Sequence, residues 1–256
     1  MQGGNNYMKK ETKDKSIEHI EIGISKTIGI YTDYALILNA CDVASKRYET
    51  IKETTGLSTT TNIPKELRLD GFEIDIQFTN KELIKEYKTD ILNKVFENYL
   101  IRSISVVDGI LEDLYEILLR NEDNLDDAEI EKRISNAWRN DNLKNYLINP
   151  NGLNLKKPNG MKMDFEETFI RYLELRIIRH SIIHTNGILT EKDFNRLKGY
   201  EEKTINERKF MALINTPLIN TERKIILSLN SLLAIRQYIH RFLMYFSKSF
   251  TQETTE

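Results

Sequence analysis

The stretch that decides the fold is TNKELIKEYKTDILNKVFENYLIRSISVVDGILEDLYEILLR, residues Thr79–Arg120. Apolar side chains recur at every third or fourth position along it, which is the period of an amphipathic helix, and no proline interrupts the pattern. Thr79 or Asn80 can cap its start, and Gly109 is its only glycine. We therefore expect either one long helix or two helices joined by a kink near Gly109.

Helical periodicity also predominates in the rest of the chain. Between Glu66 and Phe78 the period changes to two around an Asp70-Gly71 turn, which is typical of a β-hairpin. The sequence thus predicts a mainly α fold with a small β-hairpin insertion at about 66–78. One or two helices are expected at about Ser16–Lys52, and single helices at Asp127–Arg139, Phe165–Thr185 and Glu222–Phe246. Loops are expected at Thr54–Asn62 and Asn149–Met161, and short strands around Lys209–Ile214 in the ambiguous segment Gly199–Leu218.

Composition excludes several classes of protein. The 256 residues contain only 11 Gly and 4 Pro, which favours long helices over a sandwich with many turns. Lys and Arg number 37 against 39 Asp and Glu, so a uniformly basic surface that wraps DNA is excluded. The single cysteine, Cys41, cannot form an internal disulfide or a cysteine zinc site and is expected in the core. The sequence has no phosphate-binding loop or dinucleotide fingerprint, and no cofactor is expected.

Charge is unevenly distributed within this near-neutral total. Asp108–Glu131 contains ten acidic residues and one basic residue, Arg120. Such a run is more often a solvated face and loop than a docking surface for a basic partner. Lys156–Lys198 contains nine basic and six acidic residues, a net charge of +3, which suits a cleft that contacts a few phosphates.

The N-terminal segment is polar and rich in lysine, and it lacks the apolar core of a signal peptide. No run of about 18 apolar residues occurs anywhere, so we expect a cytoplasmic protein with no membrane partner. We expect residues 1–15 to be a disordered tail and residues 16–250 to form a single domain, because no linker divides the chain.

The segment RYLELRIIRHSIIHTNG, residues Arg171–Gly187, concentrates basic side chains on an otherwise apolar helix. The planar guanidinium of Arg179 suits a phosphate group. His184 lies in the expected last turn, before Asn186-Gly187, where the helix dipole favours the protonated imidazole. An arginine and a titratable histidine suffice, without a metal, to cleave RNA through its own 2′-hydroxyl.

Helix geometry constrains this pair. Residues five positions apart lie about 140° apart around an ideal helix, so Arg179 and His184 do not share one stripe. The long arginine side chain and the helix end could bring them together. Alternatively, the same segment of a second subunit could complete the site across a two-fold axis, which is the more attractive arrangement.

Arg179-His180-Ser181-Ile182-Ile183-His184 resembles the R-polar-x-x-x-H motif of the HEPN superfamily (higher eukaryotes and prokaryotes nucleotide-binding). The resemblance implies an antiparallel helical bundle and a metal-independent endoribonuclease that acts as a homodimer. It also implies a toxin or antiphage effector, with an antitoxin or regulatory protein as a partner. The site residues it implies are Arg179 and His184 as catalytic residues, with His180, Arg176, Ser181 and Asn186 supporting them or binding substrate.

Three other interpretations of these residues stay open. A non-catalytic helical module of the same type would bind a nucleotide or a protein partner. Arg179 and His180 could instead satisfy buried polar groups or pair with acids such as Asp108 or Glu112. Finally, His180 and His184 have the spacing of a metal-binding pair, but Ser181 stands where a zinc protease needs glutamate.

Overall fold

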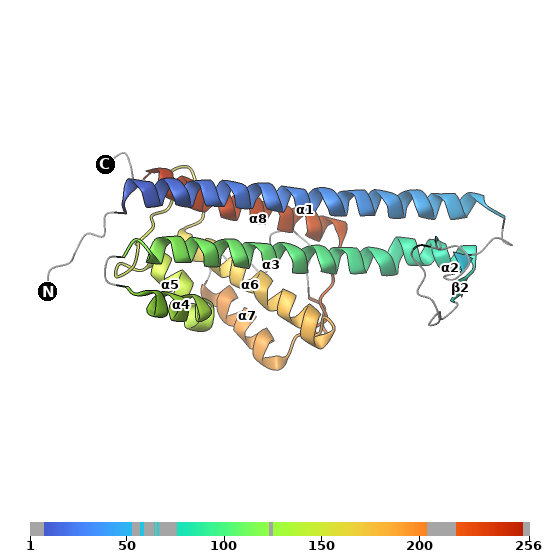
Figure 1. Ribbon diagram of the computed structural model, residues 1–256. Helices are drawn as coiled ribbons and strands as arrows, with labels where there is room; N and C mark the ends of the chain where they lie inside the picture. Colours follow the sequence, from blue (N-terminus) through green and yellow to red (C-terminus); the bar gives the residue numbers. More distant parts are fainter. Residues whose placement is uncertain are drawn as a thin grey trace. The chain divides into compact units, whose positions relative to one another are not determined.

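A computed structural model describes residues 8–52, 57–58, 64, 66, 76–122, 125–203 and 219–252, and these residues are mainly helical (Figure 1). The mainly α fold predicted from the sequence is therefore confirmed. The elements are α1 (Lys10–Thr50), β1 (Leu57–Ser58), β2 (Gln77–Phe78), α2 (Asn80–Lys85), a π-helical turn (Glu86–Asp90), α3 (Ile91–Leu119), α4 (Asp127–Ser135), a 3₁₀ turn (Arg139–Asp141), α5 (Asn142–Ile148), α6 (Phe165–Thr185), α7 (Glu191–Lys203) and α8 (Leu229–Gln252).

The first helix, α1, begins at Lys10, six residues before the expected Ser16. Packing explains the difference, because Lys13 is buried and Thr12 Oγ1 donates a hydrogen bond to Asn121 Oδ1 at 2.7 Å. The prediction of a disordered tail is thus wrong for residues 10–15, whereas residues 1–7 lie outside the described part of the chain.

The chain divides into two compact units, one made of Met1–Ile30 with Leu100–Glu256 and the other of Tyr31–Tyr99. In the first unit, the start of α1 lies against the end of α3: His19 Nε2 is 3.0 Å from the carbonyl oxygen of Ile110. The two long helices α1 and α3 continue from one unit into the other, and the single domain at 16–250 stays a prediction.

The second unit, Tyr31–Tyr99, pairs the end of α1 with α2 and the start of α3. The rings of Tyr48 and Tyr87 are stacked with centroids 6.0 Å apart, and the Asn80 side chain donates to the carbonyl of Ile51 at 3.1 Å. Cys41 is buried in this unit, as predicted.

The helical stretch predicted at Thr79–Arg120 begins at Asn80, after the cap residue, and its irregularity does not lie at Gly109. Thr79 caps α2 in a capping box with Glu82, in which each side chain bonds the backbone of the other residue. α3 runs unbroken through Gly109, so the alternative of a kink there is wrong. The helical irregularity lies instead in the π-helical turn Glu86–Asp90, where the spacing of the hydrogen bonds changes.

The strands β1 and β2 pair antiparallel, with Leu57 opposite Phe78. Sequence reasoning assigned Leu57 to a polar loop at 54–62, so β1 is a correction. Most of the hairpin predicted at 66–78, including its Asp70-Gly71 turn, lies outside the described residues.

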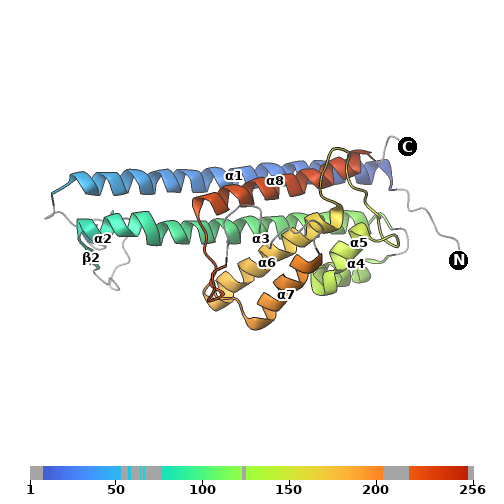
Figure 2. The same cartoon turned by 180° about the vertical axis from the view of Figure 1, so that it is seen from behind.

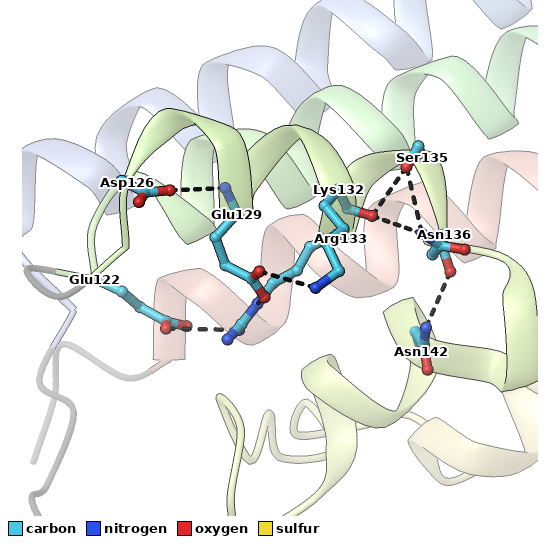
Figure 3. A network of polar contacts seen from close by, with 8 residues as sticks. All are labelled: Glu122, Asp126, Glu129, Lys132, Arg133, Ser135, Asn136 and Asn142. Carbon is cyan, nitrogen blue, oxygen red and sulfur yellow. Dashed lines mark hydrogen bonds and ion pairs between the residues drawn. The ribbon is translucent and has the colours of Figure 1, made fainter.

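Acidic residues near the end of the stretch 108–131 make local polar contacts, partly with the bases that follow it (Figure 3). Asp126 caps α4 by accepting the backbone N–H of Glu129 at 2.8 Å. The Glu129 carboxylate pairs in turn with Lys132 at 3.4 Å and with Arg133 at 3.1 Å. These contacts favour the interpretation as a solvated face with local pairing over that of a docking surface. α4 ends at Ser135 rather than Arg139, and α5 was not predicted.

The last helix, α8, starts seven residues later than the predicted Glu222–Phe246. Asn220 does not cap a helix but accepts the backbone N–H two residues further on at 3.0 Å, which closes a turn. The N–H of Ile225 donates to the carbonyl of Gly187 at 2.8 Å, so this segment bridges to the end of α6 instead of winding. α7 was not predicted, and the strands expected around 209–214 lie outside the described residues.

An aromatic core joins α6 to α8, and both helices are labelled in Figure 2. The fully buried rings of Tyr172 and Phe242 stack with centroids 4.7 Å apart. The hydroxyl of Tyr238 donates to the carbonyl of Thr168 at 2.7 Å, which fixes the register of the two helices. These contacts therefore hold α6, which carries the Arg-x4-His segment, against α8. Among the described helices, none is long and apolar enough to cross a membrane.

Candidate functional site at the end of α6

α6 ends where the sequence predicts. Asn186 adopts the left-handed conformation with φ 54° at the C-cap, and Gly187 follows with φ 77°. The N–H of Gly187 donates to the carbonyl of Ser181 at 3.0 Å, which closes the final turn. His184 is therefore in the last turn of the helix, as expected.

Three polar side chains of α6 point towards one carboxylate of α3. Tyr172, Arg176 and Arg179 recur at intervals of four and three residues, which places them on one face. Asp108 Oδ1 accepts hydrogen bonds from the Tyr172 hydroxyl at 2.7 Å and from Arg176 Nε at 2.8 Å. Arg179 Nη1 lies 3.7 Å from the other oxygen, Oδ2. The carboxylate thus links α3 to the face of α6 that carries the arginines.

Arg176 is locked in place by packing. Its guanidinium lies 3.7 Å above the centre of the Trp138 ring, a cation–π arrangement. The Trp138 indole N–H donates in turn to Glu112. Trp138 is therefore part of the support of Arg176. Asp108 and Trp138 together thus fix the position of the Arg176 guanidinium.

Arg179 is held more loosely than Arg176. A separation of 3.7 Å from the Asp108 oxygen makes an ion pair but not a hydrogen bond. Its side chain is 30% exposed, and its Nε is buried with no hydrogen-bond partner in the described part of the chain. A guanidinium has five N–H donors, so Arg179 retains donors for an incoming anion.

The two histidines lie on the exposed side of the same helix end. The rings of His180 and His184 are 4.4 Å apart between centroids, and both residues are exposed. Arg179 is directed towards Asp108, so the structure keeps the arginine and His184 on different faces, as their spacing predicts. Among the described residues, no group of three or more His, Cys, Asp or Glu side chains is placed to hold a metal ion.

Ser181 and Asn186, which were predicted to support the site, contribute to the structure of α6 itself. Ser181 is 0% exposed, and its hydroxyl is buried without a hydrogen-bond partner among the described residues, so it is not accessible to a substrate. Asn186 is exposed and supplies the left-handed C-cap. Its backbone conformation, more than its side chain, accounts for its presence at this position.

Sequence reasoning did not assign Asp108 or Tyr172 to the site. Asp108 entered only as one of the acids with which Arg179 and His180 could pair, and its ion pair with Arg179 is present. The periodicity of Tyr172, Arg176 and Arg179 was the available signal, because polar side chains on one helix face need a common polar partner. Which acid supplies it depends on tertiary packing, which local spacing does not reveal.

Comparison with known proteins finds no matching family model, no matching curated protein and no matching solved structure. The chemistry of the site therefore rests on its own geometry. A partly exposed arginine with spare donors can bind a phosphate, and an exposed histidine pair can act as general acid and base.

Burial raises the pKa of the Asp108 carboxyl, while Arg176, Tyr172 and Arg179 oppose this shift. The folded state then binds the proton of Asp108 more tightly than the unfolded state, whose pKa is about 3.9. The contribution of Asp108 protonation to the free energy of unfolding is fully present below the pKa of Asp108 in the unfolded state. It is lost as pH rises through the pKa of Asp108 in the folded state. We expect the free energy of unfolding of the wild type, relative to Asp108→Asn, to fall as pH rises from about 4.

Urea unfolding of both proteins between pH 4 and 8 measures this difference. Asp113→Asn, at an exposed position of α3, is the control and should follow the wild type in this pH range. The expectation would be contradicted if the free energy of unfolding of the wild type, relative to that of Asp108→Asn, stays constant or increases as pH rises.

Proposed function

We propose that the protein is a metal-independent endoribonuclease of the HEPN type, acting on single-stranded or loop RNA. The observation that carries the proposal is the end of α6, which presents a partly exposed arginine with spare donors and two exposed histidines within one turn of each other. The resemblance of residues 179–184 to the R-polar-x-x-x-H motif supports it. The helical bundle around α6 is the setting that such a motif requires.

In the proposed reaction, a neutral histidine takes the proton of the ribose 2′-hydroxyl. The 2′-oxygen attacks the adjacent phosphorus, and Arg179 offsets the charge that builds on the phosphoryl oxygens. The bond from phosphorus to the 5′-oxygen breaks, and a protonated histidine gives that oxygen its proton. The products are a 2′,3′-cyclic phosphate and a 5′-hydroxyl, so no water or metal is consumed in this step.

A homodimer accounts for the separation of Arg179 and His184 on α6. In a two-fold dimer each site takes the arginine from one subunit and the histidine from the other. His184 is then the catalytic histidine, while His180, whose ring contacts it, is the nearest group to share its proton. We extend the proposal, on the resemblance alone, to a cytoplasmic toxin or antiphage effector that an antitoxin or regulatory protein restrains.

The ends of the product test the reaction. Labelled RNA incubated with the protein should yield fragments with 2′,3′-cyclic phosphate and 5′-hydroxyl ends, at the same rate with and without EDTA. The same oligonucleotide with 2′-deoxyribose throughout should stay intact, because it lacks the attacking hydroxyl. Fragments with 5′-phosphate ends, or cleavage that stops with EDTA, would overturn the proposal.

One observation favours a second candidate, a non-catalytic helical module that binds a nucleotide or protein. Asp108 already neutralises part of the charge of Arg179, as a purely structural ion pair would. This candidate predicts a stable dimer that binds nucleotide or RNA and cleaves none of a broad set of RNA substrates.

A further inference from the structure

The Asp108 carboxylate divides its two oxygens between the two arginines. Oδ1 accepts short hydrogen bonds from Arg176 and Tyr172. These hydrogen bonds need only an acceptor atom, although the contact with Arg176 is also an ion pair. Oδ2 makes the long contact with Arg179, which depends on the negative charge. An amide in place of the carboxylate would therefore keep much of the first set and lose the second.

Arg179 has little else to hold its head group in one direction. A long arginine side chain at a partly exposed position has many rotamers, and ordering it has an entropic cost. Trp138 lies under Arg176 and not under Arg179. The charge of Asp108, itself only 12% exposed, is thus the main orienting contact of the Arg179 guanidinium within the described structure.

We propose that Asp108 is a positioning residue that orients Arg179 through Oδ2 and yields this guanidinium to an RNA phosphate when the substrate binds. The inference rests on the proposed ribonuclease function. It implies two opposite effects of removing the charge. Orientation of Arg179 is lost, which lowers kcat, while a competitor of the phosphate is removed, which tightens RNA binding.

The variant Asp108→Asn tests this inference, and Asp113→Asn is its matched control. Both changes remove one negative charge from α3, but Asp113 is 65% exposed and lies nearest His19, away from the arginines. We expect Asp108→Asn to lower kcat on the order of tenfold and to lower KM about threefold. Asp113→Asn should change neither by more than a general charge effect, which added salt removes.

If Asp108 only stabilised the fold, its replacement would not lower both kcat and KM. Partial unfolding reduces the amount of active protein, so the apparent kcat falls while KM is unchanged. Unchanged KM in Asp108→Asn, or a weaker affinity, would therefore overturn the inference. Circular dichroism of each variant measures the folded fraction for the correction of kcat.

Binding of a non-cleavable RNA separates this inference from the proposed function. The probe is a fluorescein-labelled RNA with 2′-O-methyl groups throughout, which lacks the attacking hydroxyl. We expect Asp108→Asn to tighten its Kd about threefold in the wild-type background and to leave Kd unchanged in the Arg179→Ala background, because the coupling passes through Arg179. Equal tightening in both backgrounds would overturn the positioning, even if the wild type cleaves RNA. If the Kd values follow the expected pattern but no RNA is cleaved, the ribonuclease function is rejected. The orientation of Arg179 by Asp108 is then still supported.

Discussion

Replacing His184 by alanine is expected to lower kcat for RNA cleavage by about 10²–10⁴, the usual contribution of a general acid or base. Replacing Arg179 by alanine should cost on the order of 10²–10³, since it removes a donor that stabilises charge in the transition state. His184 is exposed and Arg179 partly so, and neither change leaves a cavity in the core. Both variants should therefore stay folded, with an unchanged circular dichroism spectrum.

Two exposed residues of α8 serve as matched controls for these changes. His240→Ala and Arg241→Ala remove the same side chains from another helix surface and should cleave RNA like the wild type. Initial rates on one labelled RNA compare all four variants. Undiminished cleavage by either Arg179→Ala or His184→Ala would reject the assignment of that residue.

Replacing Glu174 by alanine is expected to destabilise the protein by about 3–5 kcal/mol, because it leaves a buried arginine without its carboxylate. Arg171 Nη1 donates to both carboxylate oxygens of Glu174, at 2.8 and 2.9 Å, and the two side chains are 3% and 0% exposed. The pair lies within α6, on which the whole site depends. Urea unfolding followed by circular dichroism measures the change.

The pair between Lys15 and Glu11 is the natural contrast. It also joins two residues of one helix, at 2.7 Å, but both side chains are highly exposed. Solvent screens such pairs, so Glu11→Ala should leave the midpoint of urea unfolding unchanged. Equal midpoints for Glu174→Ala and Glu11→Ala would show that burial does not determine the strength of this ion pair.

Local signals predicted the elements that local physics controls. The predicted bounds Phe165–Thr185 match α6 to the residue, because the left-handed C-cap at Asn186-Gly187 acts within a few residues. Thr79 with Glu82 marks the start of α2 for the same reason. The prediction failed where a segment pairs with residues distant in sequence. Asn220 closes a turn instead of capping a helix, because the backbone of the following residues pairs with the end of α6.

The candidate site divides in the same way. The spacing of Arg179 and His184 on a helix predicts that they face different directions, and the structure keeps them so. Burial of Ser181 and the contact of Asp108 with Arg179 depend on how α3 packs on α6. Packing of this kind is a tertiary property, and periodicity alone indicates only that the polar face of α6 needs a partner.

Mixing two inactive variants tests whether Arg179 and His184 cleave RNA together across a dimer. Arg179→Ala and His184→Ala subunits are unfolded together in urea and refolded as a mixture, so that heterodimers form. Each heterodimer has one site with both residues intact and one with neither, and half of the dimers are mixed. We predict recovery of about a quarter of wild-type activity from two proteins that are inactive alone. A mixture as inactive as its components, with heterodimers present, would contradict the composite ribonuclease site.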